Sequence, residues 1–183
     1  MPGAARTPRS CWGSSGIEVW LSWRSDNNLD VMTYTNAQAR EQLLQSLAQA
    51  IDEIAFALAA LGEAYEQLDE QSADRLEQEL FKPVQAAYGR AQRTYNEFAA
   101  RHELPDQQFG SAPSGAPSHG VKGFLDSAVD GVARADGALA TLQDSMLPVE
   151  VGDPELRAGL EDVRKLLGEV PGHVRQFVRT LGR

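Results

Sequence analysis

The chain of 183 residues has a single cysteine, Cys11, and only three histidines. A lone cysteine cannot form a disulfide within the chain and does not indicate a redox compartment. The sequence also lacks cysteine pairs at zinc spacing, a phosphate-binding loop, a dinucleotide-binding glycine pattern and a nucleophile elbow. The common motifs of hydrolases and nucleotide-binding enzymes therefore give no support to those functions.

Positive charge is scarce as well. The chain carries 17 lysines and arginines against 26 aspartates and glutamates, which gives a formal net charge of −9. Proteins that bind nucleic acid neutralise phosphates with lysine and arginine, so their binding surfaces are basic. We therefore expect no nucleic-acid partner.

Long apolar runs are missing too. No run approaches the roughly 18 to 20 apolar residues that cross a bilayer, so we expect no transmembrane segment. Near the amino terminus, glycines, serines and Glu18 interrupt the continuous apolar stretch that a secretory signal requires. The sequence thus favours a cytoplasmic protein.

Residues 1–31 differ in composition from the rest of the chain. They are electrically neutral and hold Cys11 and all three tryptophans, whereas the chain from Met32 onward carries the whole net charge of −9. We expect a non-helical extension that is either disordered or lies outside a protein whose true start is Met32. The alternative is that residues 17–23 pack onto the body as a short strand or docking segment. The sequence leaves the choice between Met1 and Met32 open.

After Met32 the apolar residues recur at alternating intervals of three and four, which is the pattern of an amphipathic helix. The first such helix is predicted over 36–69, with Thr35 and Gln38 forming a capping box at its start. Its apolar stripe consists of Leu44, Leu47, Ile51, Ile54, Leu58, Leu61, Tyr65 and Leu68.

Three further helices are predicted in the domain 32–183. The second covers 73–103, with Ser72 as its N-cap and a kink or restart at Pro83, because proline lacks the amide that a continuous helix needs. The third covers 121–146 and contains three glycines, Gly123, Gly131 and Gly137, each costing about 1 kcal/mol relative to alanine. The fourth covers 154–182, starts with Asp153 followed by proline, and is expected to bend near Pro171. The intervening segment 104–120 reads as a linker, because proline, glycine and serine dominate it.

Four amphipathic helices of this length predict an all-α fold, an elongated antiparallel four-helix bundle with up-down-up-down topology favoured. The length of the linker 104–120 also allows a crossover connection or an exchange of hairpins between subunits. With up-down-up-down topology, acidic residues gather at the end where the first two helices meet. The opposite end is then predicted to be basic, with Arg90, Arg93, Arg175 and Arg179 as candidate residues for binding an acidic partner or the acidic end of another copy.

No catalytic, cofactor-binding or metal-binding residues are assigned. Di-iron bundles place glutamates and Glu-x-x-His pairs in their core, but none of the histidines (His102, His119 and His173) follows a glutamate at that spacing. We therefore expect no cofactor and no metal, and an enzyme is the less favoured class.

The one candidate interaction surface lies on the first helix. Phe56, Ala59 and Ala60 fall outside the apolar stripe, so the helix is apolar on all sides around them. A helix that is apolar on all sides is expected to be covered by another surface. The candidates are the tryptophan-rich extension, a second subunit and a lipid-like surface, and the bland alternative is a single exposed aromatic residue.

The favoured function is a non-enzymatic helical bundle that acts through protein–protein contacts or self-association. The alternative is a carrier or coat whose amphipathic helices bind lipid or other apolar material. An enzyme with a site in the bundle core comes third. The sequence identifies neither the partner or ligand, nor the pathway, nor the oligomeric state.

Overall fold

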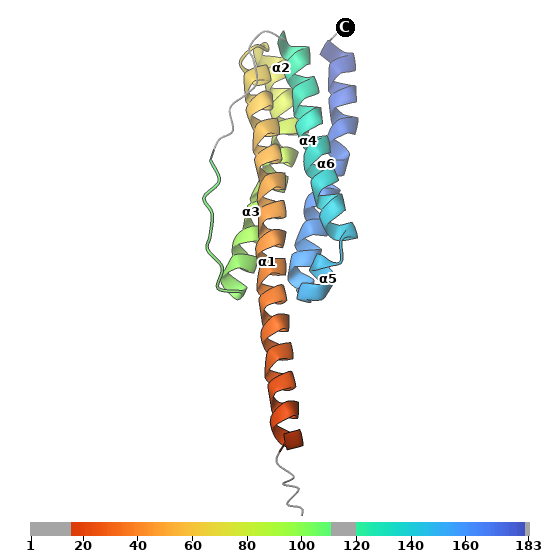
Figure 1. Ribbon diagram of the computed structural model, residues 1–183. Coiled ribbons are helices and arrows are strands. Elements are labelled where there is room, and N and C mark those ends of the chain that lie inside the picture. Colours follow the sequence, from red (N-terminus) through yellow and green to blue (C-terminus); the bar gives the residue numbers. More distant parts are fainter. Residues whose placement is uncertain (1–15, 111–119, 182–183) are drawn as a thin grey trace, which may run out of the picture. The chain divides into compact units, whose positions relative to one another are not determined.

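A computed structural model describes residues 16–110 and 120–181, and all regular secondary structure in these ranges is helical (Figure 1). The predicted all-α fold class is confirmed. The chain divides into two compact units, Met1–Ala37 and Gln38–Arg183. The second unit contains the helical bundle. In chain order the elements are α1 (Gly16–Tyr65), α2 (Glu70–Leu76), the π-helix η1 (Glu77–Phe81), α3 (Lys82–Arg101), α4 (Gly120–Asp144), α5 (Leu147–Val151) and α6 (Pro154–Leu181).

Helix α1 begins at Gly16, well before the predicted start at residue 36. The reason is the absence of helix breakers, since no glycine or proline occurs between Gly16 and Gly62. Thr35 consequently lies inside the helix and does not cap its start. The expectation of a non-helical extension is wrong for residues 16–31, and residues 1–15 lie outside the described part of the chain.

The second predicted helix is divided into α2, η1 and α3. Asp69 caps α2 by accepting a hydrogen bond from the Ser72 N–H at 3.1 Å, so Ser72 is not the N-cap that the sequence predicted. In η1 the helix widens, and the Lys82 N–H bonds to the Glu77 carbonyl five residues back. Pro83 follows directly in the first turn of α3. The chain stays helical through Pro83, so the helix does not restart there, and the predicted kink stays a prediction. The wider turn before Pro83 accommodates the missing amide and the proline ring.

The last two predicted helices are observed with an additional short helix between them. Helix α4 ends at Asp144, and α5 is a five-residue helix that was not predicted. Gly152 has a φ of 72°, a left-handed conformation that favours glycine and turns the chain into α6. Helix α6 continues through Pro171 to Leu181. The predicted bend at Pro171 stays a prediction.

Side-chain contacts give the direction of each helix in the bundle. Helix α3 is antiparallel to α6: Arg75, just before α3, lies over the Phe177 ring near one end, and Arg101 pairs with Asp153 near the other. Helix α4 is antiparallel to α6 as well (Figure 1), and Arg164 of α6 pairs with Asp136 of α4. It follows that α3 and α4 run in the same direction.

The up-down-up-down topology is therefore wrong, and the crossover alternative is confirmed. After α3 the chain returns along that helix (Figure 1), and the ring of Phe109 packs edge-on against Tyr95 at 5.0 Å. The apolar pattern could not reveal this, because it specifies which face of a helix is buried and not the helix direction. The 18 residues 102–119 reach about 60 Å when extended, roughly twice the length of α3.

The predicted apolar stripes meet in one core, except at Tyr65, which ends the stripe of α1 and is exposed. Leu47, Ile51, Ile54 and Leu61 of α1 are fully buried. The other helices contribute Leu80, Val84, Phe98, Leu125, Val132, Leu139, Leu160, Val163, Leu167 and Phe177, among others. Within the described residues, the buried polar or charged side chains are Thr94 and Asp153. The core is thus almost entirely apolar, and α1 is one of its main contributors.

Within the described residues, the segment Asn36–Glu66 of α1 is long and apolar enough to cross a membrane. More than half of its most apolar window is buried inside the bundle, and core helices of soluble proteins pass the same test. The expectation of no transmembrane segment stays a prediction.

Deleting residues 1–31 should leave the bundle intact, because the bundle belongs to the separate unit Gln38–Arg183. We expect the melting temperature to change by only a few degrees, equivalent to less than about 1 kcal/mol. Far-UV circular dichroism followed through thermal unfolding measures this. Loss of cooperative unfolding in the shortened protein would show that the extension is structural.

At Gly159, α6 lies close against Thr94 of α3. A Cβ atom there would overlap the Thr94 Oγ1 and would lie 2.6 Å from its Cγ2. Gly159→Ala should therefore lower the free energy of unfolding by about 1–3 kcal/mol. Gly168→Ala on the same helix is the matched control, since nothing lies within 4 Å of its added Cβ. It should stabilise by up to about 1 kcal/mol. Urea unfolding measures both, and similar effects at the two sites would contradict the packing described.

Candidate functional site

The predicted interaction surface on α1 is divided by the bundle. Ala60 is fully buried in the core, so its assignment to a surface is wrong. Phe56 is half-buried against α4, where the Arg134 guanidinium lies 5.2 Å from the ring centre. A Cβ at Gly131 would lie 3.1 Å from the Phe56 Cδ1, so the two helices touch here. The cover over Phe56 therefore comes from within the chain.

Ala59, the third predicted residue, lies in a groove between α1 and α3. We call this the α1–α3 groove. Its volume is about 400 Å³, and its walls are Ala55, Leu58, Ala59, Phe81, Tyr88, Gln92, Phe109 and Gly110. The walls come from α1, from the end of η1, from α3 and from the returning segment 104–110. The groove is thus a feature of the crossover topology.

Two local features form the walls of the α1–α3 groove. Phe81 is the last residue of the π-helix, so the widened turn before Pro83 sets its position. Phe109 is held at the opposite wall by its edge-on contact with Tyr95. Tyr88 is only partly exposed, and burial together with the nearby charge of Asp52 raises the pKa of its phenol. Tyr88 is therefore a neutral hydrogen-bonding group, and with Gln92 it is one of two polar side chains in the lining.

A second hollow of about 300 Å³ lies next to the groove, toward the end where α1 meets α2. Phe81 is common to both hollows, and the other walls of the second are Gly62, Tyr65, Glu66 and Glu77. The surface thus changes along α1 from apolar to acidic.

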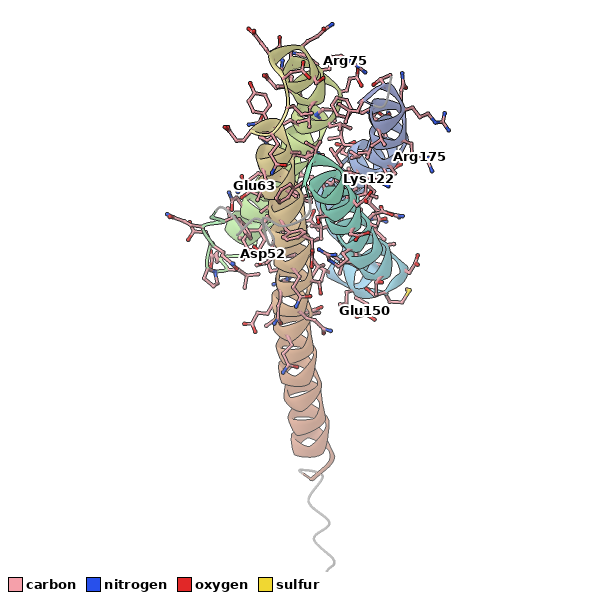
Figure 2. The ribbon with its side chains drawn as sticks, turned by 90° about the horizontal axis from the view of Figure 1, so that it is seen from above. Asp52, Glu63, Arg75, Lys122, Glu150 and Arg175 are labelled. Atoms are coloured by element: carbon pink, nitrogen blue, oxygen red, sulfur yellow. The ribbon has the colours of Figure 1, made fainter. Side chains whose placement is uncertain are left out.

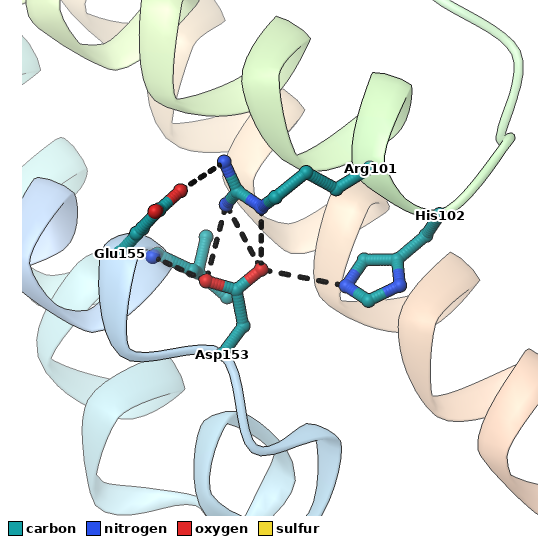
Figure 3. Close-up of polar contacts among 5 residues, drawn as sticks. Arg101, His102, Asp153 and Glu155 are labelled. Atoms are coloured by element: carbon teal, nitrogen blue, oxygen red, sulfur yellow. Dashed lines mark hydrogen bonds and ion pairs between the residues drawn. The ribbon is translucent and has the colours of Figure 1, made fainter.

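The end of α3 is joined to the start of α6 by a polar cluster (Figure 3). The Asp153 carboxylate accepts hydrogen bonds from the Leu156 N–H at 2.8 Å and from the Arg101 Nε at 3.0 Å, and a further nitrogen of Arg101 bonds both of its oxygens. Arg101 also pairs with Glu155 at 2.7 Å. His102 Nε2 lies 3.4 Å from the Asp153 carboxylate.

This cluster acts on the fold. The Asp153 side chain is 6% exposed, and the α6 amide and the guanidinium occupy both of its oxygens. Burial by itself would raise the pKa of Asp153, but the hydrogen bonds from Leu156 and Arg101 and the charge of Arg101 hold it below its ordinary value of 3.8. The carboxylate is therefore a charged helix cap that fixes two helix ends together.

The four arginines of the predicted basic end are not brought together. Arg90 pairs with Asp162 at 2.9 Å, and Arg93 is one turn further toward the end that holds Arg101. Arg175 and Arg179 lie in the last turns of α6, which reach the opposite end of the bundle (Figure 1). The prediction of one basic end is wrong because it relied on the up-down-up-down topology.

Comparisons with known proteins add no identity, since no family model, no curated protein and no solved structure matches this chain. Within the described residues, no group of three or more His, Cys, Asp or Glu side chains is placed to hold a metal ion.

Sequence reasoning identified Ala59 and the Asp153 cap but missed Phe81, Tyr88 and Phe109 as neighbours of Ala59. Phe109 is the one aromatic residue in the linker 104–120, and that was the available signal. It missed the role of Arg101 entirely, because nothing in a sequence reveals that the end of α3 meets the start of α6.

Asp153→Asn tests the polar cluster. The amide can still accept a hydrogen bond from the Leu156 N–H but loses the charge that pairs with Arg101. We expect a loss of about 2–3 kcal/mol in the free energy of unfolding at neutral pH. The control is Asp162→Asn, which removes the carboxylate that pairs with Arg90. Because the Asp162 side chain is 59% exposed, this substitution should lower the free energy of unfolding by less than about 1 kcal/mol.

The effect should also depend on pH. A carboxyl group whose pKa is lower in the folded than in the unfolded chain stabilises the fold at pH values above its unfolded pKa. That stability is lost as the pH falls through its folded pKa. For Asp153 the window begins near 3.8 and extends downward. Urea unfolding at a series of pH values should show the wild type and Asp153→Asn converging below about pH 4. A constant difference down to pH 2 would contradict the assignment.

Proposed function

We propose that the protein is a non-enzymatic helical bundle that acts through protein contacts, and that the α1–α3 groove receives an apolar side-chain anchor from a partner protein. The observation that supports this most is the hollow of about 400 Å³ walled by Leu58, Phe81, Tyr88 and Phe109. Pockets that accept an aromatic or aliphatic anchor dominate the energy of many protein interfaces.

The chemistry of the walls favours binding over catalysis. Among the residues that line the groove, the polar side chains are Tyr88 and Gln92. Neither carries a charge, since glutamine does not ionise and the raised pKa of Tyr88 keeps its phenol protonated. The lining therefore offers no carboxylate or imidazole as a general base. It offers apolar area with one or two hydrogen-bonding groups that orient a ligand.

The geometry favours a protein anchor over a lipid surface. A carrier that laid its helix stripes on lipid would have to expose core residues such as Ile51, Leu80 and Leu160, all fully buried. The groove receives a ligand without opening the core. Binding to lipid therefore remains an alternative that the experiment below separates from the proposal.

Photo-cross-linking can identify the partner. A benzophenone amino acid placed at residue 59 in the cells that make the protein should capture a specific protein. The same probe at Ala158, an exposed alanine of α6, is the matched control. A protein captured equally at both sites would not be a groove ligand.

The purified partner is then tested against Ala59→Glu, which places a carboxylate in the apolar wall. We expect the Kd to rise at least about tenfold, equivalent to about 1.4 kcal/mol, with unchanged far-UV helicity. Ala158→Glu should bind like the wild type. Sedimentation with phosphatidylcholine vesicles covers the lipid alternative. Binding to vesicles that Ala59→Glu abolishes, without any captured protein, would overturn the proposal in favour of the lipid carrier.

A further inference from the structure

One end of the bundle carries strong negative charge where α1 meets α2. Residues 62–83 have seven acidic side chains against two basic ones, a net charge of −5. The acidic side chains are Glu63, Glu66, Asp69, Glu70, Asp74, Glu77 and Glu79, and the basic ones are Arg75 and Lys82. Glu66, Glu70 and Asp74 are exposed. We call this surface the acidic half of the end.

Positive charge gathers beside it. Arg175 and Arg179, in the last turns of α6, and Lys122, in the first turn of α4, are exposed. Residues 171–181 contain no acidic side chain. A hollow of about 300 Å³ between α4 and α6 is lined by Arg175 and Arg179 together with one acid, Asp126. We call Lys122, Arg175 and Arg179 the basic half.

Both halves belong to the same end of the bundle. The turn after α1, the start of α4 and the end of α6 lie together in Figure 1, and Figure 2 shows Lys122 and Arg175 on the side of α4 and α6, away from Glu150. The link between the halves is direct, since Arg75 of α2 lies 5.5 Å from the centre of the Phe177 ring of α6. This placement is a consequence of the crossover, which turns α4 around and brings its start to this end.

The end is also apolar in part. Four large hydrophobic residues are exposed in the part of the chain that the structure describes, and Tyr65 and Leu181 are two of them. Tyr65 is 37% and Leu181 38% exposed. Each terminates its helix at this end. The surface therefore combines apolar area with two regions of opposite charge, as interfaces between proteins do.

We propose that a second copy of the chain docks on this end and forms a two-fold symmetric, end-to-end dimer. A two-fold axis in the plane of the end, perpendicular to the line that joins the two halves, places the acidic half of each copy on the basic half of the other. Such an interface is self-complementary, as a closed dimer requires. Tyr65 and Leu181 become covered, and the α1–α3 groove is not needed for the contact.

The charge pattern gives this dimer a characteristic dependence on salt. Exposed charges attract over about 10 Å at 0.1 M ionic strength and over about 3 Å at 1 M. The dimer dissociation constant of the wild type should therefore rise steeply between these conditions. Sedimentation velocity of the full chain, with a monomer mass of 19.9 kDa, measures it.

Charge reversal tests the pairing itself. Arg175→Glu with Arg179→Glu makes both halves acidic. Glu66→Lys with Glu70→Lys and Asp74→Lys changes the net charge of residues 62–83 from −5 to +1, so both halves of that variant are basic. Each variant alone should sediment as a monomer with wild-type helicity. An equimolar mixture of the two should form a heterodimer, because each now complements the other on both halves. Arg157→Glu with Lys165→Glu, two exposed positions nearer the start of α6, is the matched control and should dimerise like the wild type.

Three results would overturn the proposal. The wild type could remain monomeric at every concentration, or its dimer could survive both sets of charge reversals, which would place the contact elsewhere, including in residues 1–37. The two variants could also fail to associate when mixed. None of these variants changes a wall of the α1–α3 groove, and Glu66 lines only the adjoining hollow. Failure of the dimer would therefore leave the proposed anchor site standing.

Discussion

The parallel direction of α3 and α4 is the constraint on which the other features depend. Because both helices run opposite to α6, the chain between them must return along the full length of α3. That return places Phe109 against Tyr95 and forms one wall of the α1–α3 groove. It also brings the start of α4 to the end where α1 and α2 meet. A tight hairpin in place of residues 102–119 would remove the groove and separate the two charged halves.

The Arg101–Asp153 pair secures this arrangement at the opposite end. It is a bidentate ion pair between the buried Asp153 and the partly exposed Arg101, in a bundle whose described core is otherwise apolar, apart from Thr94. Because a pair with a buried charge adds little net stability relative to apolar residues of the same volume, we infer that its role is to specify how the two helix ends meet. Here the pair can form only where the last turn of α3 meets the first turn of α6. An alternative bundle with α3 reversed would leave the Asp153 carboxylate bonded to the Leu156 N–H but without its cation.

The sequence was sufficient to predict the four long helical segments and most of their buried faces, because the interval between apolar residues reports directly on a helix surface. The stripe of α6 from Leu156 to Phe177 is buried as predicted. Helix direction was not predictable, since reversing a helix preserves its pattern. The start of α1 was missed because Thr35 resembles a cap although no breaker precedes it. The candidate site was predicted at one residue, Ala59, and its other walls depend on contacts between distant segments.

The glycines of α4 show how a local weakness can serve packing. By helix propensity alone Gly131 and Gly137 weaken α4 equally. In the bundle they differ: a Cβ at Gly131 would lie 3.1 Å from the Glu53 carbonyl oxygen and from Phe56, whereas nothing lies within 4 Å of one at Gly137. Gly131 thus allows α1 and α4 to approach closely enough for α4 to cover Phe56, and Arg134 then reaches Glu53 at 2.8 Å. The apolar outer face of α1 is covered at Phe56 because α4 has no side chain at residue 131. At Ala59 the same face borders the α1–α3 groove, whose other walls come from α3 and from the segment that contains Phe109.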